Sequence, residues 1–260
     1  MLKMVKLVNQ GCTMFKKFLR RDFVFCLALG ANANNAEEWS KYAEKQMRGD
    51  QSHSEIMMTI KTPNWERTLE IESDVEGKKL ALSTITSPAK EKGIRTLRIE
   101  NNMWNYFPKL KRKVAVSSSM LLASWMGSDF TNDDILKASS MAEDYSHKFL
   151  PNQKKDGQDF RVIENSAKSE AKVMWPRIIT FASPVDCLPR QYHYFDKQGN
   201  IKRILYLDTI KTFDGHKVPT NWVMQPQDDM NKKTTIVYKK MSFKTAFKPT
   251  HFTQKNLTDY

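Results

Sequence analysis

The side chains in this chain that could take part in the widest range of chemistry are its histidines. They are His53, His147, His193, His216 and His251. No two of them stand at a metal-site spacing such as HxxxH, and no CxxC pair accompanies them. A lone histidine is more often a surface or strand-edge residue than a ligand. The pattern therefore predicts no metal centre.

Three aspartates, Asp129, Asp133 and Asp134, form the densest acidic group that could hold a cation. Helix capping explains this group better. Thr131 can serve as an N-cap, and Asp134 stands at the capping-box position three residues later. Phe130 can pack against Ile135 as a hydrophobic staple. The run therefore predicts the start of a short helix rather than a cation site.

The sequence also lacks the usual patterns of nucleophilic catalysis and of phosphate binding. Cys187 has no partner histidine motif and is expected to be a buried or inert thiol. The sequence contains no Gly-rich phosphate loop and no G-x-S-x-G elbow. We therefore predict a protein that is not an enzyme and needs no cofactor.

The most informative stretch is apolar and runs from Met103 to Leu136. Ser119 is a good N-cap and Gly127 a good C′ residue, so a helix of about two turns is predicted between them. So short a helix is marginal alone in water and needs apolar surroundings. Those surroundings are either an ordinary core or a ligand cavity. We favour the ligand cavity, with this helix as a removable plug that closes it and with hinges at Ser119 and Gly127.

Strands must position this plug. Residues 36–47 have helical spacing, but from residue 53 apolar side chains alternate with polar ones, as in half-buried antiparallel strands. Turn sequences such as Asp214-Gly215 separate them. The predicted fold is mainly β with helices (α+β): one large, strongly curved antiparallel sheet, an unclosed half-barrel whose concave face short helices plug. The predicted strands span 55–60, 65–71, 80–85, 97–99, 103–107, 114–116, 160–163, 178–181, 191–195, 201–207, 218–224 and 234–243, and a helical turn is predicted at 252–257.

A curved sheet that does not close leaves a concave apolar face for a ligand. Aromatic, aliphatic and methionine side chains give a soft and reversible grip on apolar chains. The residues predicted to form this cavity and its lid are Trp65, Leu69, Ile71, Leu82, Leu97, Ile99, Trp104, Tyr106, Met120, Leu121, Leu122, Trp125, Met126, Phe130, Trp222 and Met224.

Residues 1–36 have the features of an export signal. Four basic residues precede the short apolar run 23–31, and Ala31-Asn32-Ala33 fits a cleavage site. Met14 is an alternative start, cleavage is expected near Ala33 or Ala36, and a buried N-terminal helix is the competing interpretation. The signal carries six Lys/Arg and one acid, so residues 37–260 would have 42 − 6 = 36 bases and 29 − 1 = 28 acids, a charge of +8. This charge favours binding to anionic membrane surfaces or to acidic partners. The alternative is that it only makes the surface of a soluble protein basic.

The export signal also bears on cysteines and partners. The residues before Cys26 are not those of a lipoprotein signal, so no lipid anchor is expected. Cleavage would remove Cys12 and Cys26, and a single remaining cysteine cannot form an internal disulfide. Nucleic acid is disfavoured, because no nucleic-acid module is present. We predict a soluble periplasmic domain spanning 37–260, with no Pro/Ser/Gly linker to divide it.

Several segments resemble the LolA-like outer-membrane lipoprotein-sorting proteins. They are 103–108 (MWNYFP), 117–120 (SSSM), 125–134 (WMGSDFTNDD), 188–189 (LP), 214–222 (DGHKVPTNW) and 252–257 (FTQKNL). The resemblance implies a half-open barrel with a helical lid in the periplasm. It implies a monomeric carrier that binds acyl chains of lipoproteins or other lipids for sorting toward the outer membrane. The alternative is a periplasmic binding or sensor module, associated with a resistance-nodulation-division exporter or an envelope-stress system, without lipid transfer.

Overall fold

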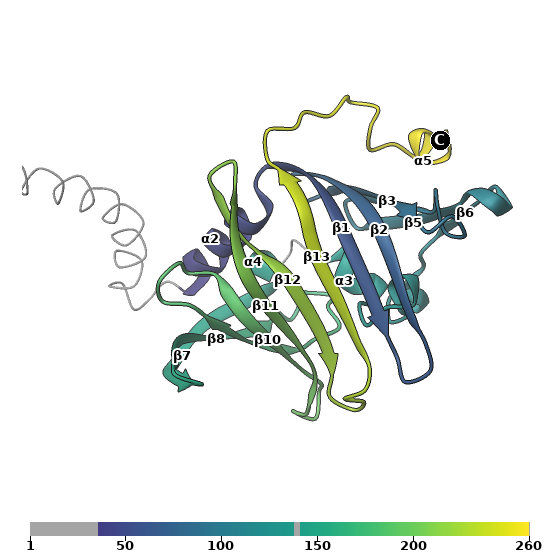
Figure 1. The fold of residues 1–260 in the computed structure, drawn as a ribbon. Coiled ribbons are helices and arrows are strands. Elements are labelled where there is room, and N and C mark those ends of the chain that lie inside the picture. The colour runs from purple at the N-terminus through teal and green to yellow at the C-terminus, as the bar shows by residue number, and fades with distance from the viewer. Residues whose placement is uncertain (1–35, 138–140, 260) are drawn as a thin grey trace, which may run out of the picture.

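One antiparallel sheet of 13 strands dominates the part of the chain that the computed structural model describes, residues 36–137 and 141–259 (Figure 1). The strand order is β6-β5-β4-β3-β2-β1-β13-β12-β11-β10-β9-β8-β7, so β6 and β7 are free edges and the sheet is not closed. This confirms the predicted half-barrel. The strands are β1 (Gln51–Lys61), β2 (Glu66–Glu76), β3 (Leu80–Ser87), β4 (Arg95–Ile99), β5 (Asn102–Phe107), β6 (Arg112–Ala115), β7 (Tyr145–Lys155), β8 (Gln158–Ala167), β9 (Arg177–Ala182), β10 (Pro189–Phe195), β11 (Ile201–Phe213), β12 (His216–Pro226) and β13 (Lys233–Ser242).

Short helices accompany the sheet: α2 (Ala36–Arg48), α3 (Asn132–Leu136), α4 (Met141–Asp144) and α5 (Gln254–Thr258). The sequence predicted α2, α3 and the C-terminal turn α5. In α2, Trp39 and Ala43 are buried, and the helix packs against β7, β12 and α4. Glu37 and Glu38 occupy its first turn, where the helix dipole favours negative charge.

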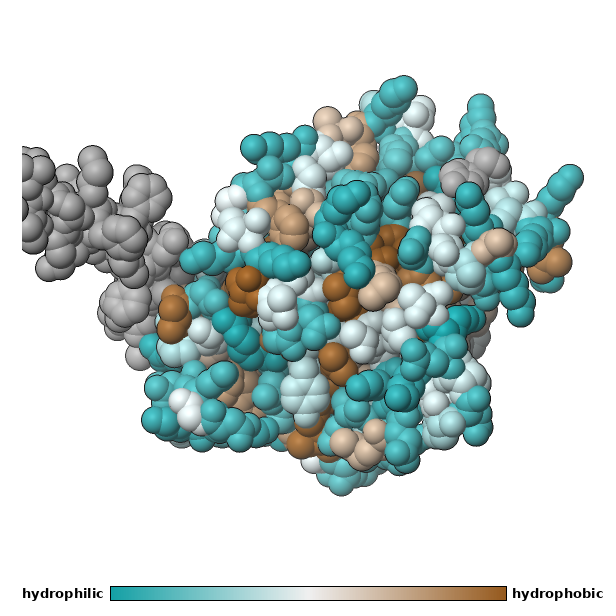
Figure 2. All heavy atoms as spheres, in the orientation of Figure 1, coloured by the Kyte–Doolittle hydropathy of each residue, from teal (hydrophilic) through white to brown (hydrophobic). Residues whose placement is uncertain are grey.

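The sheet presents different chemistry on its two faces. On β3, Ala81 and Ser83 line the interior cavity, so the alternating Leu82 points to the opposite, outer face. There Leu82 and Leu97 form a buried cluster with Phe252 and Leu257 of the C-terminal segment. Figure 1 shows α5 beside this end of the sheet, and the face turned to the viewer in Figure 2 is largely hydrophilic with scattered apolar residues.

The predicted helix between Ser119 and Gly127 is wrong. Two single turns of 3-10 helix, Ser118–Met120 and Trp125–Gly127, stand in its place. Met126 and Gly127 both have positive φ, +51° and +74°, which a continuing right-handed helix excludes. Leu122 is 63% exposed, whereas Trp125 is only 6% exposed. The segment is therefore an irregular loop that buries one tryptophan.

Tertiary hydrogen bonds explain why the chain forms this loop rather than the predicted helix. Its carbonyls accept from the free amides at the start of α3: Ala123 O from Asn132 N at 3.0 Å, and Leu121 O from Asp133 N at 3.0 Å. Met120 O accepts from Asn132 Nδ2 at 2.9 Å. A two-turn helix is marginal, so these bonds suffice to displace it.

The edge strand β7 was missed by the sequence prediction. Its sequence, YSHKFLPNQKK, is interrupted by Pro151 and ends in two lysines, and all of its last five residues are exposed. Proline and exposed lysine are typical of edge strands, where they discourage pairing with other chains. The opposite edge, β6, carries exposed Arg112 and Lys113 for the same effect.

The expected signal 1–36 lies outside the described residues, except for Ala36. Within the described ranges, no helix is long and apolar enough to cross a membrane. Cys187 is buried, as expected, but it is disulfide-bonded, so the prediction of a thiol is wrong. The chain's other cysteines, Cys12 and Cys26, lie outside the described residues.

Candidate binding cavity

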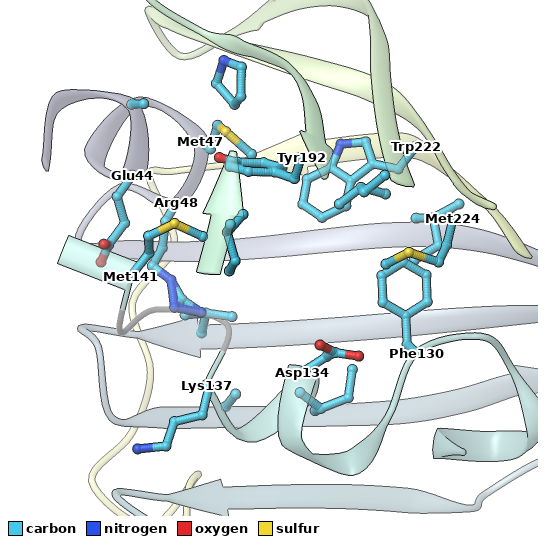
Figure 3. Close-up of a pocket in the computed structure, with 18 of the residues that line it drawn as sticks. Glu44, Met47, Arg48, Phe130, Asp134, Lys137, Met141, Tyr192, Trp222 and Met224 are labelled. Carbon is cyan, nitrogen blue, oxygen red and sulfur yellow. The ribbon is translucent and has the colours of Figure 1, made fainter. Parts of the chain in front are cut away.

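A cavity of about 350 Å³ lies on the concave face of the sheet (Figure 3). Residues from α2, α3 and α4 and from eleven of the strands contribute to its wall. The volume falls within the range of pockets that bind small molecules, about 300–1,000 Å³. The half-barrel thus leaves room for a ligand beside its own side chains.

One end of the cavity is aromatic and aliphatic. Phe130, Tyr192, Trp222 and Met224 gather there in Figure 3. The indole nitrogen of Trp222 donates to Pro219 O at 2.8 Å, so its ring presents only carbon to the space. Burial raises the pKa of the Tyr192 hydroxyl, which stays protonated. This end can contact an apolar chain, and the Asp134 carboxylate beside Phe130 is paired with Arg203.

The other end is charged. Glu44 and Arg48 of α2, Arg98 of β4 and Lys137 after α3 all line it. In Figure 3, Glu44, Arg48 and Lys137 stand away from the aromatic group. Arg98 is 3% exposed, and Nη1 donates to Leu136 O at 2.9 Å. The cavity is therefore amphipathic along its length.

Burial governs the titration of these charged groups. It raises the pKa of Glu44, against the positive charges of Lys78 and Arg48, and it lowers the pKa of Arg48, against the charge of Glu44. Burial, with a smaller contribution from the positive charge of Arg48, lowers the pKa of Arg98 to about 10. Arginine keeps its charge in proteins at neutral pH, so both guanidinium groups are cationic.

Helix α2 places Glu44 and Arg48 on one face, because residues four apart in a helix lie one above the other. Gly49 ends the helix with φ +64°. A Cβ built on Gly49 would lie 2.4 Å from the Phe243 ring, so the close approach of β13's end to α2 also requires glycine. Gly49 thus fixes the position of Arg48.

The substitution Gly49→Ala is expected to destabilise the protein by more than the backbone term of about 1–2 kcal/mol for a non-glycine residue in the left-handed region. The added clash with Phe243 accounts for the excess. Gly77 is the matched control, since it also has positive φ, +55°, but no atom within 4 Å of an added Cβ. Urea denaturation of Gly49→Ala and Gly77→Ala should show a larger loss for the first. Equal losses would contradict the role of the Phe243 contact.

The loop that lines the cavity is anchored to the sheet by a buried ion pair. Arg203 of β11 binds both carboxylate oxygens of Asp134, with Nη1–Oδ2 at 2.7 Å, and Nη1 also donates to Asp129 O at 3.1 Å. The predicted capping box is confirmed, because Thr131 and Asp134 exchange both capping hydrogen bonds. Asp129 Oδ2 accepts from Thr234 Oγ1 at 2.7 Å, and its Oδ1 lies 3.0 Å from Lys232 Nζ. The aspartates therefore fasten the loop to the sheet.

Trp125 covers the part of the cavity nearest β1, β2 and β4. Its ring packs in a buried cluster with Met58, Leu69 and Ile71. Its indole nitrogen donates to Thr96 Oγ1 at 3.1 Å. Both apolar contact and a hydrogen bond hold it against the concave face.

The structure brings five of the sixteen predicted cavity residues to the cavity wall: Ile71, Trp125, Phe130, Trp222 and Met224. Leu69 and Met126 lie in the packed cluster around Trp125 rather than at the wall. Trp65 is 46% exposed. In the loop, Met120 and Leu122 are exposed and Leu121 is half-buried, and none of the three lines the cavity, which corrects their assignment to the plug.

Five further predicted residues lie on the wrong face. Leu82, Leu97, Ile99, Trp104 and Tyr106 pack in the outer cluster under the C-terminal segment. Alternation of apolar and polar residues shows that a strand has two different faces, but it does not say which face is concave. On this part of the sheet the small or polar alternates, Ala81, Ser83 and Arg98, face the cavity instead.

The predicted hinges have distinct environments. Gly127 is exposed, and a Cβ there would lie 3.2 Å from Arg67 Nη2. Arg67 also donates to Met126 O, which ties this end of the loop to β2. Ser119 is exposed, and its hydroxyl lies 2.8 Å from that of Ser117. Ser119 and Gly127 thus flank the loop, and their hinge role stays a prediction.

Sequence reasoning missed the charged residues of the cavity. A signal for Arg98 was available, because Arg98 alternates with Leu97 and Ile99 in a short strand and must face opposite to them. The prediction assigned Leu97 and Ile99 to the concave face, and this placed Arg98 on the solvent-exposed face. Within residues 36–137 and 141–259, no group of three His, Cys, Asp or Glu side chains could hold a metal ion.

Comparison with known proteins agrees with this architecture. Residues 77–259 match the sequence model of a family described as an uncharacterized protein family. No curated protein matches the chain. Among solved structures, a putative outer membrane lipoprotein-sorting protein domain from Vibrio parahaemolyticus is similar at 21% identity and a TM-score of 0.76, covering 87% of this chain and 100% of that one.

Two further structures have the same fold. A DUF1329 family protein from Desulfovibrio piger has 19% identity and a TM-score of 0.79, covering 86% of this chain and 98% of its own. A LolA superfamily protein from Nitrosomonas europaea has 18% identity and a TM-score of 0.73, covering 85% and 98%. The chain therefore belongs to the family whose model matches residues 77–259, and it has the fold of the LolA-like lipoprotein-sorting proteins.

Proposed function

We propose that this protein is a periplasmic carrier that binds the acyl chains of lipoproteins or other lipids in its concave cavity and acts in sorting toward the outer membrane. The observation that supports this most is the cavity itself, whose aromatic and methionine end offers apolar contact without hydrogen-bond direction. Each buried methylene of a ligand contributes about 0.8 kcal/mol. Even a short chain segment would therefore bind.

We also propose how the protein reaches the periplasm and that it acts there as a monomer. Residues 1–36 act as the export signal, and 37–260 form a soluble monomeric domain without a lipid anchor. Cleavage of this signal would leave Cys187 as the single cysteine of the remaining chain and would exclude an internal disulfide, because Cys12 and Cys26 lie within residues 1–36. The carrier performs no catalysis. The named relatives include a putative outer membrane lipoprotein-sorting domain and a LolA superfamily protein, which supports this class of function over others. An inner-membrane exporter is a proposed partner.

The loop between Ser119 and Gly127 is proposed to act as a movable cover rather than as the helical plug first predicted. Trp125 is its one buried residue, and Trp125 and the following Phe130 line the cavity. Movement of this loop would enlarge the cavity for a longer chain. The apolar contacts of Trp125 would be exchanged for contacts with the ligand, so the free energy required is partly offset.

Filling the cavity tests the carrier function. Ala81 lines the cavity, so Ala81→Trp places a large ring where the chain would lie. Excluding two methylenes at about 0.8 kcal/mol each weakens binding roughly tenfold. Fluorescence titration with a fatty acyl probe measures this effect. The matched control is Ala115→Trp, which adds the same ring at an exposed position of β6.

Two outcomes would contradict the carrier function. One is a folded wild-type protein that binds no acyl probe, and the other is an Ala81→Trp variant that binds as tightly as Ala115→Trp. Retrieval of a membrane transporter by a protein that binds no lipid would instead support the sensor or docking alternative.

A further inference from the structure

We propose that the charged end of the cavity is a subsite for the anionic head of an amphiphilic ligand, a carboxylate or a phosphate, with Arg48 as the principal ligand and Arg98 beside it. The inference rests on the proposed function, because the apolar chain of the same ligand would occupy the aromatic end. It adds a chemical class to the cargo: a chain that carries a negative charge at one end.

The first observation is the placement of two arginines in one enclosed space. Arg48 is the last residue of α2, and Arg98 lies near the end of β4, yet both line the same cavity. They are close enough for the charge of Arg48 to lower the pKa of Arg98, in addition to the larger effect of burial. Two like charges in a poorly solvated cavity repel each other, and a bound anion would offset that repulsion.

The second observation concerns the hydrogen bonds of Arg48. Its Nη1 atom is buried and has no hydrogen-bond partner within the described ranges. A buried donor without an acceptor is unfavourable, and such groups in native proteins call for an explanation. The planar guanidinium matches the oxygens of a carboxylate or phosphate. A ligand oxygen beside Arg48 would satisfy this donor.

The acidic residues at the cavity do not supply that acceptor. Glu44 Oε1 lies 3.5 Å from Lys78 Nζ, and burial raises the pKa of Glu44. Asp134 forms an ion pair with Arg203. Asp133 accepts from Met174 N at 3.3 Å, and burial raises its pKa as well. Asp134 is therefore committed to Arg203. Neither oxygen of Glu44 bonds to Arg48, since within the described ranges both are buried without a hydrogen-bond partner.

The shape of the cavity sets the orientation of the ligand. In Figure 3, Arg48 lies on the side of α2 and Met141, while Trp222, Met224 and Phe130 lie on the opposite side. The head would face α2 and the chain would extend toward Trp222. A chain of equal length without a charge would fill the same apolar space but leave Arg48 without its acceptor.

The test compares two probes that differ only in charge: cis-parinaric acid and its methyl ester, titrated by fluorescence into the full chain at neutral pH. Wild-type protein is expected to bind the acid about tenfold more tightly than the ester, which corresponds to one charge-assisted hydrogen bond. Arg48→Met should remove this preference, so that the acid and the ester bind with similar affinity. Arg48→Lys should keep part of it, because the charge remains but the fork of donors does not.

The control for net charge is Lys240→Met, on β13, whose side chain is 73% exposed and pairs with Glu55 at 2.9 Å. It should keep the preference for the acid. Glu44→Gln should strengthen acid binding severalfold relative to ester binding, because it removes a competing negative charge near Arg48.

The outcomes separate this inference from the carrier function. Equal binding of acid and ester by wild-type protein would overturn the subsite and leave the carrier function standing, and this comparison requires no variant. A folded Arg48→Met protein that still prefers the acid would also overturn it. Binding of neither probe would contradict the carrier function, and the subsite with it. Inorganic phosphate that competes with the acid but not with the ester would support a subsite for the head alone.

Discussion

Replacing Arg203 by methionine is expected to lower the free energy of unfolding by about 3–5 kcal/mol, the cost of breaking a buried ion pair from one side. The side chain of Arg203 is 6% exposed and that of Asp134 is 15% exposed. Without Arg203, the Asp134 carboxylate would remain largely buried without its partner charge. The guanidinium also stacks on Trp175 and Tyr194, 4.4 and 4.5 Å from their ring centroids, so these contacts are lost too.

Arg177 provides a matched control for this prediction. Its Nε lies 2.6 Å from Glu164 Oε1, and its guanidinium lies 4.5 Å from the centroid of the Phe195 ring, but its side chain is 42% exposed. An exposed ion pair contributes about 0–1 kcal/mol, so Arg177→Met should cost little. Urea denaturation at neutral pH measures both variants. Similar decreases in the free energy of unfolding for Arg203→Met and Arg177→Met would contradict the prediction that burial makes the Arg203 ion pair the more stabilising one.

The substitution Trp125→Ala is expected to destabilise the protein by about 3–5 kcal/mol, as for other large-to-small changes of a buried aromatic side chain. The ring is 6% exposed, packs against Met58 and Leu69, and donates to Thr96. Removing it opens a space that joins the ligand cavity. Thermal or urea denaturation measures the loss.

Leu122, three residues earlier in the same loop, is the control. It is 63% exposed, so Leu122→Ala should change stability by no more than about 0.5 kcal/mol. The helical plug predicted from sequence would instead bury both residues and give both substitutions a large cost. A large loss for Leu122→Ala would therefore contradict the loop and favour the helix.

The contrast between Leu122 and Trp125 shows where sequence reasoning succeeds and where it ends. Alternating residues predicted twelve of the strands, because a pleated sheet with two different faces imposes a period of two. The half-barrel was implied by the resemblance to the LolA-like proteins. The capping box of Thr131 and Asp134 was found because it is local. The loop of Leu122 was not, because its hydrogen bonds go to Asn132 and Asp133, and no local pattern records them.

The candidate site was harder to predict for a related reason. The period of two separates Leu97 from Arg98, but only the curvature of the whole sheet decides which of them lies inside. The usual expectation of apolar residues inside led to the wrong choice, since Leu97 is buried on the outer face by Leu257. A cavity built to hold a polar group reverses that expectation. Charged residues such as Arg48 and Arg98 are then the informative ones.

Mass spectrometry of molecules extracted from the natively purified full chain tests the central claim of an acyl-binding cavity most directly. Wild-type protein and Ala115→Trp should each yield an acylated molecule in an amount comparable to the protein, and Ala81→Trp should yield much less. The same preparations should take up a fatty acyl probe in the same order. Folded wild-type protein that carries no acylated molecule, and takes none up when it is supplied, would contradict the account.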